Sequence, residues 1–120
     1  FTSPQVAGVG YTEKEYMQRT GACSCRTFSL SNLTRAGIAG ETDGLIKIVV
    51  EPKTGRVVGL HVFSPNASDI ITEGVYAVKH GLTYQEIIDT GHIFPSYSEG
   101  IKLAAQSFIR DISKMPCCVE

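Results

Sequence analysis

The most reactive side chains of the sequence are four cysteines in two close pairs. Cys117 and Cys118 are adjacent near the C-terminal end, and Cys23 and Cys25 flank a single serine. A disulfide-stabilised secreted domain would be shorter or richer in cysteine, with wider spacings. Close thiols are instead typical of soft-metal binding or redox chemistry. We therefore predict that Cys117 and Cys118 take part in metal binding or redox chemistry.

Cys23 and Cys25 have a simpler explanation. Residues two apart on a strand point to the same face, so these thiols could also bind a soft metal. Buried cysteine is nevertheless a common filler of hydrophobic cores, and we favour that interpretation.

A second candidate group lies between His92 and Glu99, where the sequence reads HIFPSYSE. Ser96 and Glu99 have the spacing of a capping box at a helix start. Glu99 therefore has two interpretations, a functional carboxyl or a helix cap. Tyr97 is either a functional phenol or an aromatic residue at an interface.

Composition bounds the possible functions. A chain of 120 residues, 42% hydrophobic and 19% charged, is one globular domain. Its net charge of -1 gives no electrostatic basis for binding nucleic acid or an acidic membrane. No signal peptide or membrane-spanning apolar run is present, so we expect a cytoplasmic protein. The abrupt start at Phe1 suggests a fragment of a longer protein.

Periodicity and capping signals predict the elements that position these residues. A strand is expected over 5–10, a helix from Thr12 to about Gly21, a strand over 23–30, and a loop or short turn over 31–40. Two segments rich in β-branched residues, 45–50 and 56–63, enclose Pro52 and Gly55 and predict a β-hairpin.

The second half of the chain has helical spacing. One helix is expected around Ile71 to Val78 with Gly81 as its stop, a short one from the Thr83–Glu86 capping box to Asp89, and a last one whose apolar face runs from Ile101 to Ile112. Strands followed by helices favour an α+β fold, an antiparallel β-sheet with helices packed on one face. We expect a domain over 1–112 and a flexible C-terminal tail over 113–120 with the vicinal cysteine pair.

Three segments carry a resemblance to a known family. Residues 2–13 (TSPQVAGVGYTE), the hairpin from Gly44 to His61, and the motif from His92 to Glu99 resemble the C-terminal dimerisation domain of the flavoprotein disulfide reductases. The resemblance covers essentially the whole chain. It implies a homodimer, and FAD and NADPH bound by other domains of the same polypeptide.

One difference from the family's motif indicates which branch of the family the chain resembles. Family members that act on small thiol substrates carry a catalytic His directly before the motif's proline, where this chain has Phe94. Without that imidazole, the acid–base pair that protonates a leaving thiol is missing. The mercuric reductase branch also lacks it and carries a cysteine pair near the C-terminus, as Cys117 and Cys118 do here. That branch reduces Hg(II) to Hg(0).

The resemblance also implies roles for individual residues. Cys117 and Cys118 would bind Hg(II) and deliver it to the active site of the partner subunit. Tyr97 would be a functional phenol on the mercury path, and Phe94 and Pro95 would face the partner's FAD. With no His to orient, Glu99 is expected to be a helix cap, and His92 is not expected to replace the missing His.

Two alternatives remain at this point. One is the same domain from another reductase of the family, of the dihydrolipoamide dehydrogenase type, which Phe94 disfavours. The other is a non-catalytic metal-binding dimerisation module. In every case the isolated chain is expected to be inactive and to bind no flavin, because it has no Gly-rich phosphate-binding turn of the dinucleotide type.

Overall fold

The computed structural model describes residues 4–110. The elements follow in the order β1 (Gln5–Gly10), α1 (Glu13–Thr20), β2 (Ser24–Ser29), a 3₁₀ turn (Leu30–Asn32), α2 (Thr34–Ala39), β3 (Leu45–Val50), β4 (Val57–Ser64), α3 (Ala67–His80), α4 (Tyr84–Asp89) and α5 (Glu99–Gln106).

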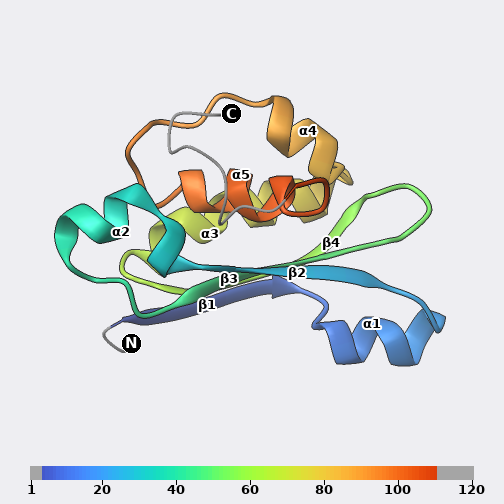
Figure 1. Cartoon of the computed structure of the whole chain (residues 1–120). Coiled ribbons are helices and arrows are strands. Elements are labelled where there is room, and N and C mark those ends of the chain that lie inside the picture. The colour runs from blue at the N-terminus through green and yellow to red at the C-terminus, as the bar shows by residue number, and fades with distance from the viewer. Residues whose placement is uncertain (1–3, 111–120) are drawn as a thin grey trace.

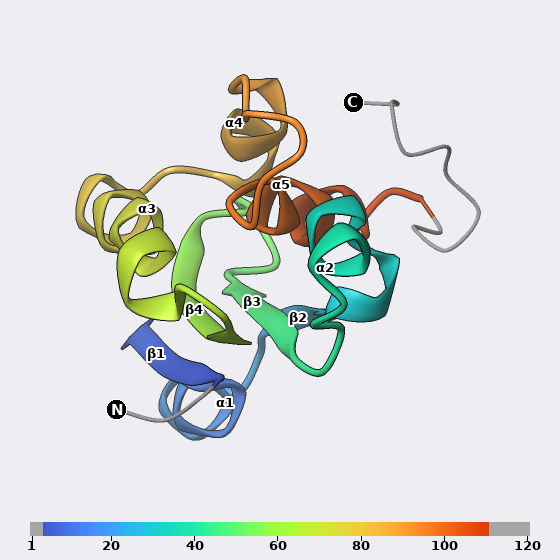
Figure 2. The same ribbon diagram turned by 90° about the vertical axis from the view of Figure 1, so that its left-hand side faces the viewer.

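The four strands form one sheet in the order β1-β4-β3-β2, and every neighbouring pair is antiparallel. Helix α3 packs on β1 and β4, and α5 packs on β2 and β3. Figures 1 and 2 show α2 to α5 above one face of the sheet and α1 on its other side. The predicted α+β fold, an antiparallel sheet covered by helices, is confirmed.

The predicted hairpin forms the centre of the molecule. Strand β4 pairs with both β1 and β3, so its helix-facing side chains and those of β3 are fully enclosed: Ile46, Ile48, Leu60 and Val62. In the connecting turn, the Glu51 carboxylate accepts hydrogen bonds from the backbone N–H groups of Lys53 and Thr54 at 3.1 and 2.8 Å. Gly55 closes the turn at a φ of 76°, as its position predicts.

Both predicted capping boxes are present. Thr12 and Glu15 satisfy each other's backbone N–H at the start of α1, and Thr83 and Glu86 do so at the start of α4. Tyr11 and Tyr16 lie on either side of the first cap, with their ring centroids 5.2 Å apart.

Two predictions about the helices need correction. The segment 31–40, expected to be a loop or short turn, contains the 3₁₀ turn and the short helix α2. Its helical turns bring Leu30, Leu33 and Ala36 into the core, so tertiary packing stabilises a helix that has no side-chain cap. The last helix ends at Gln106, and Phe108 lies beyond it, with its ring centroid 4.6 Å from that of Tyr84. Ile112 lies outside the described residues.

Gly59, on β4, allows the backbone at Tyr11 to pass directly against the strand. A Cβ atom on Gly59 would lie 1.9 Å from the carbonyl oxygen of Tyr11, where the chain leaves β1 for α1. We predict that Gly59→Ala lowers the free energy of unfolding by about 3 kcal/mol, the upper end of the usual cost of overpacking. Urea unfolding followed by circular dichroism would measure it.

Gly37, in α2, is the matched control, because a Cβ atom there meets nothing within 4 Å. Gly37→Ala should raise stability by about 0.5–1 kcal/mol through helix propensity. Equal effects of the two substitutions would contradict this role of Gly59.

Candidate functional site

The loop between α4 and α5 presents the motif that the sequence singled out. Ile93 is 76% exposed and Phe94 is 45% exposed, and Pro95 is exposed beside them. Large apolar side chains held in water at the tip of an ordered loop are typical of a surface that meets another protein or domain. Phe94 and Pro95 therefore lie where a partner could contact them.

His92 attaches this loop to α3. Its Nε2 atom lies 2.7 Å from Oε2 of Glu73, its Nδ1 atom lies 2.8 Å from the carbonyl oxygen of Thr90, and its side chain is only 5% exposed. Both ring nitrogens face acceptors, so the doubly protonated imidazolium fits the site. The hydrogen bond to Glu73 is the main cause that raises the pKa of His92, and burial opposes it. His92 is thus a positioning residue.

Tyr97 and Glu99 point inward. Tyr97 is 7% exposed, and the Arg35 guanidinium carbon lies 5.7 Å from the centroid of its ring. Its hydroxyl is buried without a hydrogen-bond partner among the described residues. The structure places Tyr97 in the core beneath α2, away from the exposed tip of the loop.

The expected cap role of Glu99 is only half correct. Oγ of Ser96 accepts a hydrogen bond from the Glu99 backbone N–H at 3.2 Å, but the Glu99 carboxyl accepts none from the Ser96 backbone N–H, and the N-cap residue is Ser98. The carboxyl is 8% exposed, and its Oε1 atom has no hydrogen-bond partner in the described part of the chain. Burial raises the pKa of Glu99. The helix begins after Ser98, so Ser96 and Glu99 do not occupy the N-cap and N3 positions that a capping box needs.

Only one of the two cysteine pairs lies within the described residues. Cys117 and Cys118, with the tail over 113–120, lie outside the described residues. Cys23 and Cys25 were expected to fill the core, but both are only half-buried and lie beside Glu13, at the start of α1. Burial is the main cause that raises the pKa of the Cys25 thiol, followed by its hydrogen bond to the Glu13 carboxylate. The core interpretation of this pair is therefore wrong.

The other two histidines make contacts within the fold. Nε2 of His61 lies 2.9 Å from the carbonyl oxygen of Tyr11, and the His80 ring stacks on Tyr76 with a centroid distance of 6.2 Å. Between residues 4 and 110, no three His, Cys, Asp or Glu side chains gather to hold a metal ion. No helix in that range is long and apolar enough to cross a membrane.

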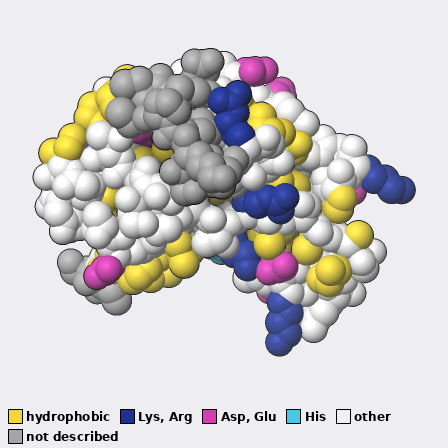
Figure 3. Space-filling view, in the orientation of Figure 1, with side chains coloured by type: hydrophobic (Ala, Val, Ile, Leu, Met, Phe, Trp, Pro, Cys, Tyr) yellow, Lys and Arg dark blue, Asp and Glu magenta, His cyan; other side chains and the backbone are white. Residues whose placement is uncertain are grey.

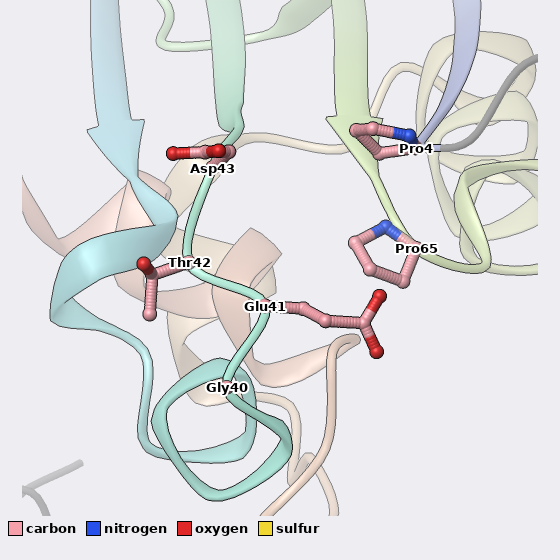
Figure 4. Close-up of a pocket in the computed structure, with 6 residues that line it drawn as sticks. All are labelled: Pro4, Gly40, Glu41, Thr42, Asp43 and Pro65. Carbon is pink, nitrogen blue, oxygen red and sulfur yellow. The ribbon is translucent and has the colours of Figure 1, made fainter.

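Two hollows lie at separate places on the surface. One, of about 320 Å³, is lined by the apolar side chains of Tyr76, Leu82 and Ile87 and by Glu73 and His92. The other, of about 300 Å³, lies between Pro4, Pro65 and the loop from Gly40 to Asp43, and the Glu41 carboxylate extends across it toward Pro65 (Figure 4). On the face that Figure 3 shows, basic and acidic side chains are interspersed, without a large area of one sign.

An antiparallel sheet with helices on one face matches the fold of the dimerisation domain of the flavoprotein disulfide reductases. Residues 1–105 match the family model "Pyridine nucleotide-disulphide oxidoreductase, dimerisation domain". The chain belongs to this family, whose members are FAD- and NAD(P)H-dependent flavoproteins.

Individual relatives agree with this assignment. The chain is 41% identical to a mercuric reductase of Streptomyces lividans and 39% identical to one of Shigella flexneri, each over 118 residues. These matches cover 98% of this chain but 25% and 21% of the relatives, so the chain spans about a quarter of their length. Among solved structures, LpdA from Mycobacterium tuberculosis aligns with a TM-score of 0.84 at 30% identity, over 92% of this chain and 24% of LpdA. The flavoprotein disulfide reductase RclA from Escherichia coli aligns at 0.83 and 24% identity, over 90% of this chain and 25% of RclA.

The pair of His92 and Glu73 predicts a pH-dependent stability. Because the folded-state pKa of His92 is raised above its unfolded value of about 6.5, the stabilisation is fully present below that pH and is lost as pH rises through the folded pKa. The stability advantage of the natural chain over Glu73→Gln should therefore be larger at pH 6 than at pH 9. Urea unfolding at both pH values would measure this.

Glu41→Gln, at the distant hollow, serves as the control and should show no such difference between the two pH values. A proton NMR titration in which Glu73→Gln leaves the His92 pKa unchanged would contradict the pairing.

Proposed function

We propose that this chain is the dimerisation domain of an NADPH-dependent mercuric reductase, which reduces Hg(II) to Hg(0). The observation that carries the proposal is Phe94, which stands exposed at the motif position where dithiol-acting relatives have a catalytic His. Relatives named mercuric reductase, 36–41% identical over nearly the whole chain, support it.

The reaction needs no acid–base side chain at the metal. Hg(II) gains two electrons and NADPH gives up a hydride, so the products are Hg(0), NADP⁺ and a proton. FAD, when bound, supplies this two-electron chemistry. An exposed apolar loop tip fits a position against a flat flavin ring, so Phe94 and Pro95 would contact the FAD of the partner subunit and exclude water from it.

The cysteine pair would supply the metal ligands. Hg(II) is a soft ion that prefers thiolates to nitrogen or oxygen ligands, and it passes between thiolates by ligand exchange. Cys117 and Cys118 would take the ion from other thiols and deliver it to the partner's active site. The hydroxyl of Tyr97 is buried. The proposed role of Tyr97 on the mercury path therefore rests on the family resemblance.

The dimer would form through an apolar surface around the loop. Tyr76, on α3, is 57% exposed and lines the same hollow as His92. Because His92 directly precedes Ile93 and Phe94, the exposed side chains of Tyr76 and of the loop belong to one region of the surface. A symmetric homodimer is the usual way to cover such a surface.

The whole polypeptide provides the test of activity. A protein that carries this domain behind its flavin and nicotinamide domains should oxidise NADPH when given Hg(II), and only poorly when given a small disulfide. Cys117→Ala with Cys118→Ala should lower the rate by about tenfold or more when the mercury arrives bound to competing thiols, because ligand exchange then needs both thiolates. Absorbance at the NADPH band would follow both reactions.

Ser113→Ala, in the same segment of the sequence, is the control and should keep the rate. Rapid turnover of a disulfide with no response to Hg(II) would refute the proposed function in favour of a dihydrolipoamide dehydrogenase type. An unchanged rate in the double variant would refute only the delivery role.

The dimer surface can be tested on this chain. Ile93→Asp should weaken self-association at least tenfold, about 1.4 kcal/mol, because it would bury a carboxylate in an apolar contact. Ile38→Asp, at another well-exposed position on α2, should leave it unchanged. Sedimentation equilibrium would give both constants, and equal effects of the two substitutions would place the interface elsewhere.

A further inference from the structure

The sheet face opposite α2 to α5 carries a group of reactive side chains that the proposed function does not use. Figure 1 shows that α1 lies on this side of the sheet, below β2 and β3. Glu13 begins α1, Cys25 lies on β2, and Lys47 lies on β3. Cys23 directly precedes β2, two residues before Cys25, and therefore shares its face.

Both thiols converge on Glu13. Sγ of Cys23 lies 3.8 Å from the Glu13 backbone carbonyl oxygen. Lys47, helped by the neighbouring Cys25 thiol, lowers the pKa of the Glu13 carboxyl. The same carboxylate accepts a hydrogen bond from Nζ of Lys47 at 2.8 Å. Three elements thus bring two thiols to one place, with an ion pair beside them.

The geometry of the strand opposes a disulfide between these cysteines. Same-face neighbours on an extended strand have Cα atoms about 6.6–6.8 Å apart, at the upper end of the range of about 4.4–6.8 Å that disulfides span. The pairing of Ser24 with Val50 and of Cys25 with Val49 holds the strand extended, so a direct sulfur–sulfur bond is disfavoured. Both cysteines are free in the structure. An ion placed between the two sulfur atoms would bridge a wider gap than a direct bond.

We propose that Cys23 and Cys25 form a second, two-coordinate thiolate site for a soft divalent metal ion of the Hg(II) type. Each thiol loses its proton as its sulfur–metal bond forms, so two protons are released for each ion bound and no electrons are transferred. Both protons pass to the surrounding water, and Glu13 stays ionised in its ion pair with Lys47.

The charges of the completed site balance. Two thiolates neutralise the divalent ion, and Lys47 neutralises Glu13, so no net charge is left at the half-buried face. A two-ligand site also agrees with the absence of any three-ligand cluster between residues 4 and 110. This proposal concerns binding alone and does not rest on the proposed catalytic function.

The test uses the reduced 120-residue chain and Hg(II) as the probe, in the presence of an excess of a simple monothiol. Two thiols on one strand outcompete separate monothiols because the second bond forms within the molecule. The tail variant, Cys117→Ala with Cys118→Ala, leaves the sheet unchanged and should bind one Hg(II) per chain by native mass spectrometry. Adding Cys23→Ala and Cys25→Ala to it should abolish binding.

Alkylation adds a readout that does not depend on the folding of a sheet variant. In the tail variant, one equivalent of Hg(II) should protect both Cys23 and Cys25 from iodoacetamide. Ser24→Ala, between the two thiols, is the matched control and should keep binding and protection. No bound Hg(II) in the tail variant, protection of only one cysteine, or one Hg(II) shared between two chains would each overturn the proposal.

Discussion

The enclosure of the β3–β4 hairpin is the constraint on which the rest of the structure depends. Ile46, Ile48, Leu60 and Val62 are almost completely excluded from water between the sheet and its helices. Full burial of one such side chain contributes about 1.5–3 kcal/mol, so these four stabilise the centre of the core substantially. Close approach of the helices requires small residues, and Gly74 of α3 and Gly100 of α5 lie directly against Leu60 and Ile46. The position of α5, and hence of the loop that precedes it, follows from that contact.

The features that sequence predicted well are those fixed over a few residues. Thr12 with Glu15, and Thr83 with Glu86, form their caps within a single turn, so their spacing alone identifies them. The hairpin likewise follows from strand propensity on either side of Gly55. The dimerisation-domain family was recognised from the order of such short motifs and is confirmed by the match over residues 1–105.

The features that sequence missed depend on distant contacts. Helix α2 exists because Leu33 and Ala36 find a core formed by other elements, which no local signal in 31–40 reveals. The hydrogen bond between His92 and Glu73 joins residues 19 positions apart, on a loop and on α3. Glu13 and Lys47 are 34 positions apart, so the surroundings of Cys25 were equally hidden and the core interpretation failed.

The loop before α5 has Phe94 where dithiol-acting relatives have a catalytic His, and this difference limits the acid–base chemistry that the loop can perform. His92 already donates to Glu73 and Thr90, so its proton is held in structural bonds. The Glu99 carboxyl is buried, and its raised pKa favours the neutral form, which costs less to bury than an unpaired charge. The side chains left exposed at the tip, Ile93 and Phe94, carry no proton to transfer. A site built in this way is poorly suited to protonating a leaving thiolate, which agrees with the proposed reduction of Hg(II).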